Sequence, residues 1–253
     1  MAASNIIRSG TKVMAEFPVL MVDHGAFSHL SQELLSDLVT EAATMLPTVS
    51  QDAFFGQLKS HTVFLNVARI NHTCSPNVAY YFDPVTMSTR LYAVRNIYPG
   101  AELTIGYVDL TQPSQMRQFS LSPWNFTCSC PRCTQPSHQQ RESDARASQL
   151  LDIRNGLDKY NFRFQDGPQK AELLITLYEL EGLEVRVHEA YYRAAIEFNG
   201  VKDKWKAVKF ARLCLDRGLL LKDETRPFVV QMRSLVEDVE GHWSWGFRLG
   251  GEE

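Results

Sequence analysis

The sequence lacks long apolar runs, an excess of basic residues and any secretory leader pattern. Its longest apolar stretch, Phe17–Val22, is far shorter than the roughly 20 residues that a membrane-spanning helix needs. The formal net charge is -3, and the basic residues form no stripe of the kind that holds nucleic acid by its phosphates. The stretch Met1–Val13 has neither the basic nor the apolar region of a signal peptide. These absences predict an intracellular protein, cytoplasmic or nuclear, whose partner is a protein or a small molecule, with no role for a membrane or nucleic acid.

Cysteine is also scarce, and its spacing favours a metal site over disulfides. The chain has five cysteines, an odd number that is typical of reduced thiols, and three of them lie within six residues: Cys128, Cys130 and Cys133. Their C-x-C-x2-C spacing suits thiolates that converge on a tetrahedral Zn²⁺ ion. Cys74, in a tight polar turn, is the better fourth ligand, because Cys214 lies among apolar helical neighbours and fits a small buried side chain. The alternative for the triplet is a set of reduced surface cysteines.

The pattern of the remaining residues predicts an α+β chain. Short β-like segments around a Ser-Gly turn fill Asn5–Asp23, and an amphipathic helix is expected within Phe27–Leu46. Strands and turns return over Thr62–Tyr107, including a hairpin closed near Asp83. Gln112–His138 is rich in Pro, Ser and Cys, so it needs a staple such as zinc to become ordered.

Beyond about Ser143 the apolar spacing becomes helical and predicts an antiparallel array of helices. The segment Ala190–Gly218 is similar to a tetratricopeptide helix pair, with alanines where two helices would approach each other. Two interpretations remain open for this region: a helical cap on the core domain, or a peptide-binding groove.

Three motifs together resemble a known family. They are NHTCSPN (Asn71–Asn77), ELTIGY (Glu102–Tyr107) and FTCSCPRC (Phe126–Cys133). In order and spacing they resemble the SET-domain protein lysine methyltransferases, and most of all the SET and MYND class and its fungal relatives. The resemblance implies a β-rich SET-like fold with a pseudoknot over residues 1–136, followed by an all-helical C-terminal domain over residues 143–253. It also implies a helical insertion at about 27–60 and a zinc-bound post-SET loop at about 124–136.

The resemblance implies a role for each matched residue. Tyr107 corresponds to the catalytic tyrosine at the methyl-transfer point, and Cys74 to the cysteine that completes the zinc site with the triplet. The residues that correspond to the S-adenosylmethionine site are Asn71, His72, Trp124 and Phe126. Tyr80 and Tyr81 are candidate walls of a substrate channel, although strand tyrosines are more often part of a core or a surface. The implied activity is methyl transfer from S-adenosylmethionine to a protein lysine.

The sequence departs from the family pattern at its start. Family members carry a glycine-rich stretch before the first strand, and its backbone approaches the methyl donor closely, as only glycine allows. The first glycine here is Gly10, at the turn of the first strand pair. We therefore expect weak donor binding, and a second function stays open. In that alternative, a degenerate SET fold has lost S-adenosylmethionine and serves as a binding module or as a donor-independent enzyme on a small molecule, for example in fungal secondary metabolism.

Overall fold

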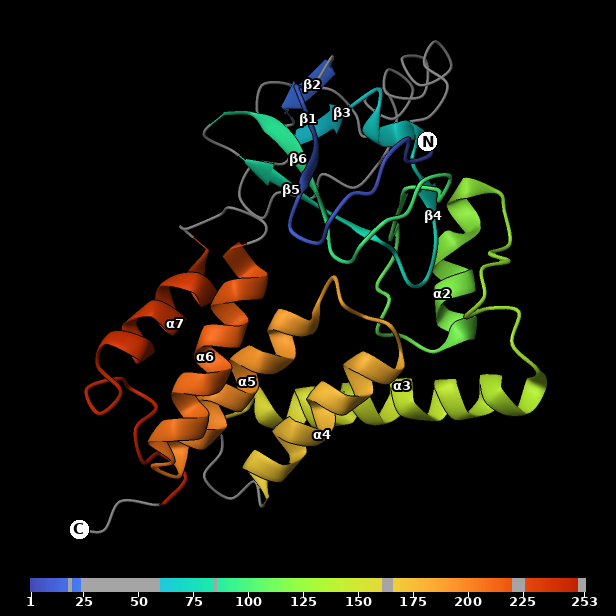
Figure 1. Ribbon diagram of the computed structural model, residues 1–253. Coiled ribbons are helices and arrows are strands. Elements are labelled where there is room, and N and C mark those ends of the chain that lie inside the picture. The colour runs from blue at the N-terminus through green and yellow to red at the C-terminus, as the bar shows by residue number, and fades with distance from the viewer. Residues whose placement is uncertain (18–19, 24–59, 84–85, 161–165, 220–225, 250–253) are drawn as a thin grey trace. The chain divides into compact units, whose positions relative to one another are not determined.

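The computed structural model describes residues 1–17, 20–23, 60–83, 86–160, 166–219 and 226–249 (Figure 1). The predicted helix within Phe27–Leu46, and nearly all of the predicted insertion, lie outside these ranges. By its packing the chain divides into two units. The first unit is Met1–His72 with Asn77–Tyr107, and the second unit is Thr73–Pro76 with Val108–Glu253. The domain boundaries at 136 and 143 stay a prediction.

The first unit contains antiparallel strands. β1 (Lys12–Glu16), β6 (Ser88–Ala93) and β5 (Val78–Asp83) form a sheet in the order β1-β6-β5. β5 and β6 are the predicted hairpin, which the register Asp83↔Ser88 to Val78↔Ala93 confirms. β2 (Leu20–Asp23) pairs antiparallel with β3 (Ser60–Val63), as a separate ladder.

The core of the first unit joins the sheet to the segments on either side of it. A 3-10 helix, η1 (Val67–Arg69), follows β3, and Glu16 accepts hydrogen bonds from the backbone N–H groups of Asn66 and Val67 at its start. Apolar side chains of the sheet, of η1 and of the segment that follows β6 pack into one buried cluster, whose members include Phe64, Val67, Ile70, Val78, Leu91, Ile97, Leu103 and Ile105. Two sequence motifs are thereby attached to this core, because Ile70 directly precedes NHTCSPN and Ile105 lies within ELTIGY.

The second unit is helical (Figure 1). Its elements are α2 (Ser114–Leu121), η2 (Ser122–Trp124), α3 (Ser137–Leu157), α4 (Gly167–Leu180), α5 (Val187–Gly200), α6 (Lys204–Leu219) and α7 (Pro227–Glu237). From α3 to α7 each helix packs against the next one in the chain. The buried alanines Ala190, Ala194 and Ala211 let α5 and α6 approach closely. The predicted helical C-terminal region is confirmed, and α3 begins several residues earlier than the sequence pattern indicated.

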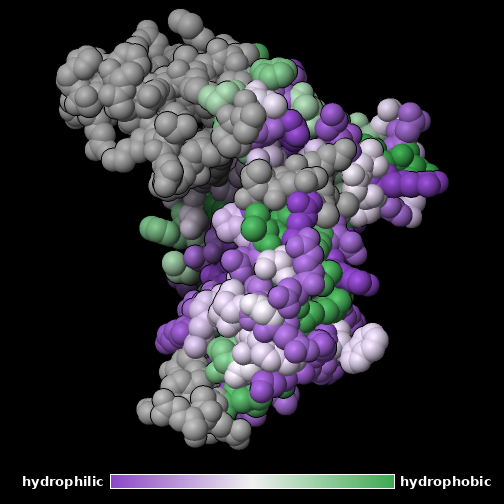
Figure 2. Space-filling model, turned by 90° about the vertical axis from the view of Figure 1, so that its left-hand side faces the viewer, coloured by the Kyte–Doolittle hydropathy of each residue, from purple (hydrophilic) through white to green (hydrophobic). Residues whose placement is uncertain are grey.

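The sequence pattern did not predict α2. Its only buried residues are Arg117 and Leu121, whereas Met116 and Phe119 are exposed. This inverts the usual arrangement, in which apolar residues define the buried face. On the face shown in Figure 2, hydrophobic and hydrophilic side chains are mixed. Within the part of the chain that the structure describes, no helix is long and apolar enough to cross a membrane.

Candidate functional site

Two of the sequence motifs meet in the first unit as a pair of short parallel strands. β4 (Asn71–His72) lies beside β7 (Thr104–Ile105), with Asn71 opposite Thr104 and His72 opposite Ile105. Side-chain hydrogen bonds stabilise the pairing of β4 with β7. The amide nitrogen of Asn71 donates to a carboxylate oxygen of Glu102 at 2.6 Å. Asn77 donates to the backbone carbonyl of Glu102 at 2.8 Å and accepts from the Thr104 N–H at 2.9 Å. The two asparagines thus fix NHTCSPN against ELTIGY.

Tyr107 lies just beyond β7, and three contacts with two residues set its position. Its hydroxyl donates to the backbone carbonyl of Ile70 at 2.6 Å. Its backbone N–H donates to Nδ1 of His72 at 3.0 Å, and the two rings lie tilted with centroids 5.3 Å apart. Because Nδ1 of His72 accepts this bond, it carries no proton, and the ring orientation is fixed. His72 is therefore a positioning residue for Tyr107 in this structure.

The environment of Tyr107 keeps its hydroxyl neutral. Burial raises the pKa of Tyr107, and the negative charge of Glu102 raises it further. The phenol therefore holds its proton at neutral pH, and that proton is directed at the Ile70 carbonyl. The lone pairs of the hydroxyl oxygen remain able to accept a hydrogen bond from a ligand.

Tyr80 and Tyr81 are neighbours on β5, so their side chains point to opposite faces of the sheet. Tyr80 packs against the core cluster of the first unit, and Tyr81 is buried, with Arg90 as its partner in the β5-β6 register. Because the two rings lie on opposite faces, they cannot both line one channel along a single face. Their role as channel walls stays a prediction.

Trp124 and Phe126 belong to the second unit. Trp124 is the last residue of η2, and Asn125 after it adopts a left-handed backbone conformation, with φ of 54°, that ends this turn. Phe126 is exposed within the described residues. Their role as an aromatic lid over the donor stays a prediction.

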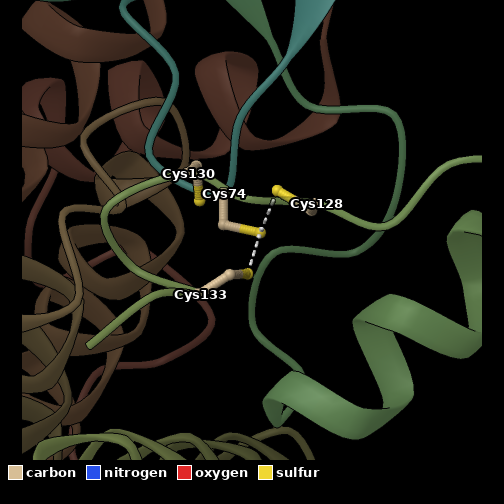
Figure 3. Close-up of side chains that lie close together, drawn as sticks. All are labelled: Cys74, Cys128, Cys130 and Cys133. Atoms are coloured by element: carbon tan, nitrogen blue, oxygen red, sulfur yellow. Dashed lines mark hydrogen bonds between the residues drawn. The ribbon is translucent and has the colours of Figure 1, made fainter. Parts of the chain in front are cut away.

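The cysteines of the second unit converge as the spacing predicted. The sulfur atoms of Cys74, Cys128, Cys130 and Cys133 all lie within 4.8 Å of one another (Figure 3). The Sγ of Cys74 is 4.0 Å from that of Cys128 and 3.5 Å from that of Cys133. Four thiolates bound tetrahedrally at a Zn–S distance of about 2.3 Å have sulfurs about 3.8 Å apart. The cluster therefore fits Zn²⁺ in both donor type and size, whereas Cys214 is buried in the helical core.

Backbone contacts shape the loop that carries the triplet. The Cys133 N–H donates to the Cys130 carbonyl at 2.8 Å, which closes a tight turn between the two ligands. The side chain of Gln118 on α2 donates to the Cys128 carbonyl and accepts from the Cys128 N–H, both at 3.0 Å. Burial raises the pKa of the Cys128 thiol to about 12. Hydrogen bonds from Cys133 and Cys74 instead lower the pKa of Cys130. A zinc ion that binds all four cysteines as thiolates would displace the protons that they hold, so we expect its affinity to fall as the pH falls.

A buried ionic network attaches this loop to the helices of the second unit. Arg132, between two of the cysteines, donates to the backbone carbonyls of Cys74 and Leu110 and pairs with Glu181 at 2.8 Å. Glu181, at the end of α4, also accepts hydrogen bonds from Ser143 and Arg146. The carboxylate of Glu181 therefore ties α3, α4 and the cysteine loop together.

The sequence pattern did not predict several of these contacts. Asn77 and Glu102 lie inside the quoted motifs, so their roles in joining the motifs could have been predicted from that position. Gln118 and Glu181 had no such signal, because their partners lie 10 and 49 residues away with no repeating pattern.

Comparison with known proteins agrees with this geometry. Residues 1–108 match the SET domain family. The chain is 35% identical over 100 residues to the histone-lysine N-methyltransferase SET5 of Scheffersomyces stipitis, an alignment that covers 38% of this chain and 21% of that protein. It is 29% identical over 167 residues to set5 of Schizosaccharomyces pombe, covering 59% and 52% respectively. It is 34% identical over 85 residues to the N-lysine methyltransferase SMYD2 of Sus scrofa, covering 33% and 19%.

These matches and the site together define the class of protein. The chain contains a SET domain over residues 1–108 and is related to the SET5 and SMYD-family lysine methyltransferases. It spans between about a fifth and about half of the length of these three relatives.

Proposed function

We propose that the chain transfers a methyl group from S-adenosylmethionine to the side-chain amine of a lysine in a protein substrate, inside the cell. The observation that carries the proposal is the fixed position of Tyr107, whose hydroxyl is held by the Ile70 carbonyl at the junction of the two SET motifs. The kinship with proteins named as histone-lysine and N-lysine methyltransferases supports the choice of substrate class.

Asn71 and His72 would hold the donor from the first unit. Asn71 is exposed, and among the described residues its amide oxygen takes part in no hydrogen bond, so it can accept one from the amino group of an amino acid. Trp124 and Phe126, in the second unit, stay candidates for aromatic contacts with the donor. When bound, S-adenosylmethionine supplies an electrophilic methyl group on a sulfonium. The residues present fit this group, because they offer amide and aromatic contacts.

Tyr107 would orient the lysine. An in-line displacement needs the neutral amine to be aligned with the methyl group, so alignment is the main task of the protein. The neutral hydroxyl of Tyr107 can accept a hydrogen bond from the amine N–H, because its own proton is donated to Ile70. The amine lone pair is then left to point away from the tyrosine, toward the reacting carbon.

The cysteine cluster would have a structural role. With four protein ligands and no open position, a zinc ion there would order the loop and would not take part in the chemistry. Reduced thiols at this density fit an intracellular compartment.

The test compares the unchanged chain with Tyr107→Phe. Each protein is incubated with S-adenosylmethionine at millimolar concentration, so that weak donor binding does not hide turnover, and with core histones and a library of lysine-containing peptides. Mass spectrometry then detects methylated lysine. Tyr107→Phe removes one hydroxyl, so we expect the fold to persist and the rate to fall by a factor on the order of 10 to 1000.

Tyr92→Phe is the matched control. Tyr92 is fully buried on β6, and its hydroxyl has no hydrogen-bond partner among the described residues, so its removal should leave both rate and stability unchanged or slightly improved. Equal rates for the unchanged chain and Tyr107→Phe would remove Tyr107 from the chemistry.

Calorimetry with S-adenosylmethionine separates the two functions that the sequence left open. Micromolar binding supports methyl transfer. If binding is undetectable and no lysine in the panel is methylated at millimolar donor, the donor-independent SET fold becomes the better account.

A further inference from the structure

Arg117, on α2, is a fully buried cation, and none of the described residues is an acidic partner for it. Its exposed fraction is 0%. One terminal nitrogen, Nη1, donates to the backbone carbonyl of Gln112, and the other, Nη2, lies 3.9 Å from the Sγ of Cys133. Its Nε is buried without a hydrogen-bond partner, and among the described residues no carboxylate lies within ion-pair distance of it. A buried charge is costly unless it is compensated, so among the described residues its counter-charge has to come from a group other than a carboxylate.

The cysteine cluster is a group that can supply this negative charge. Four thiolates around one Zn²⁺ would carry a net charge of about -2, at a cluster in which two of the cysteines are buried and two are half-buried. Such a charge also needs compensation, and hydrogen bonds from cations to anions are the strongest kind available. The guanidinium of Arg117 and the sulfur of Cys133 are therefore suited to compensate each other.

Arg132 would be the candidate by sequence, since it lies between Cys130 and Cys133, but the structure gives it another partner. Its guanidinium pairs with Glu181 and donates to backbone carbonyls. The charge of Arg132 is thus already balanced by a carboxylate. Arg117 is 16 residues from Cys133 in the sequence, yet among the described residues its guanidinium lies next to the Cys133 sulfur.

We propose that Arg117 is the cation that balances the zinc-thiolate cluster. By doing so it strengthens zinc binding and lowers the reactivity of the bound sulfurs. This role is separate from methyl transfer and stands whether or not the chain is a methyltransferase. It also gives α2 a function: its consecutive residues Arg117 and Gln118 hold the charge and the backbone of the cysteine loop, respectively.

The test measures zinc affinity by competition with a chromogenic chelator, and zinc release during alkylation by N-ethylmaleimide, followed with a zinc-sensitive dye. Arg117→Met removes the charge and keeps most of the side-chain volume. We expect zinc affinity to fall about 10- to 100-fold, the range found for groups that support metal ligands. Zinc release by the alkylating agent should become faster, because the thiolates lose a neutralising donor.

Arg248→Met is the matched control. Arg248 is also buried and belongs to the second unit, but it pairs with Glu197. We expect this substitution to lower the thermal midpoint while leaving zinc affinity and zinc release unchanged. Zinc affinity of Arg117→Met within about threefold of the unchanged chain would overturn the proposal, and so would an equal loss in Arg248→Met.

If Arg117→Met does not accumulate as folded protein, Arg117→Lys is used to test the proposal. Lysine keeps the charge and loses the fork of the guanidinium. Zinc affinity within about tenfold of the unchanged chain would support charge compensation. A loss of zinc from a folded Arg117→Lys protein, or a failure of this variant to fold, would show that the shape of the side chain matters more than its charge, and would overturn the proposal.

Discussion

At the scale of single residues, the neighbours of a buried thiol decide whether it can act together with other thiols. Cys74 is fully buried and its sulfur lies within reach of the triplet, whereas Cys214, equally buried, donates to the backbone carbonyl of His188 inside the helical core. Burial also raises the pKa of Cys214 to about 12. An isolated thiol of this kind is neither a metal ligand nor a ready nucleophile at neutral pH.

Substitution of the cysteines should distinguish a thiol of the four-cysteine cluster from the isolated thiol of Cys214. We expect about one zinc per chain by elemental analysis, and Cys130→Ser should lower both the zinc content and the thermal midpoint, because the loop loses one of its four staples. Cys74→Ser should behave in the same way. Cys214→Ser is the control and should leave the zinc content unchanged. A full zinc content in Cys74→Ser would exclude Cys74 from the site.

The sequence was sufficient to place the four ligands, because thiolate spacing is a local signal and Cys74 lay in a polar turn. Tyr107 could be singled out as a candidate because it belongs to a motif, and its catalytic role stays a prediction. The hydrogen bond from Tyr107 to Ile70 could not be predicted from the sequence, since it joins residues 37 positions apart through a backbone carbonyl. The burial of Arg117 beside a cysteine could not be predicted either, because a single arginine among polar residues is normally solvated.

At the scale of elements, α2 shows where apolar periodicity fails as a guide. Its exposed Met116 and Phe119 and its buried Arg117 are the opposite of an amphipathic pattern. The helices from α3 to α7 were predictable because each buries an apolar stripe against its neighbour, and this signal depends only on nearby residues. The pairing of β4 with β7 was not predicted, since two-residue strands carry no period of their own.

The junction between α4 and the cysteine loop depends on one carboxylate. Glu181 is 4% exposed and accepts from Arg132, Arg146 and Ser143. Glu181→Gln removes the negative charge and leaves the buried guanidinium of Arg132 uncompensated. We expect the free energy of unfolding of the zinc-loaded chain to fall by about 3 kcal/mol, measured by urea denaturation.

The control for this loss is an ion pair between helices at the surface. Glu172 and Lys206 lie 3.0 Å apart with nearly half of each side chain exposed, so water screens the pair. Glu172→Gln should cost less than about 1 kcal/mol. Similar losses in the two variants would show that the Glu181 network contributes no more than a surface pair.

At the scale of the whole molecule, the second unit should lose stability in mild acid. Burial lowers the pKa of His188, on α5, to about 4 from an ordinary value of 6.5. Between these two values the unfolded chain takes up a proton and the folded chain does not, so the free energy of unfolding decreases as the pH falls through this window. The largest decrease from this group is roughly 3 kcal/mol, from about 1.4 kcal/mol per pKa unit.

His188→Gln removes the titrating group and should flatten the pH dependence between about pH 6.5 and 4, measured by urea denaturation at a series of pH values. Asp109 and Glu189 contribute in the same direction at lower pH. Burial alone would raise their pKa values, but Arg186 lowers both below the ordinary carboxyl value, so the stability that they contribute is lost on further acidification. An unchanged slope in His188→Gln would show that His188 is charged in the folded chain.

The four residues Thr73–Pro76 pack with the second unit, although the chain on both sides of them belongs to the first. This has a consequence for biosynthesis. Cys74 leaves the ribosome 54 residues before Cys128 and 59 before Cys133. At a translation rate of about 5 to 20 residues per second, its thiol waits roughly 3 to 12 s for the rest of the metal site. Zinc can be enclosed only after that interval, so a nascent chain passes through a stage in which Cys74 is open to oxidants and to chaperones.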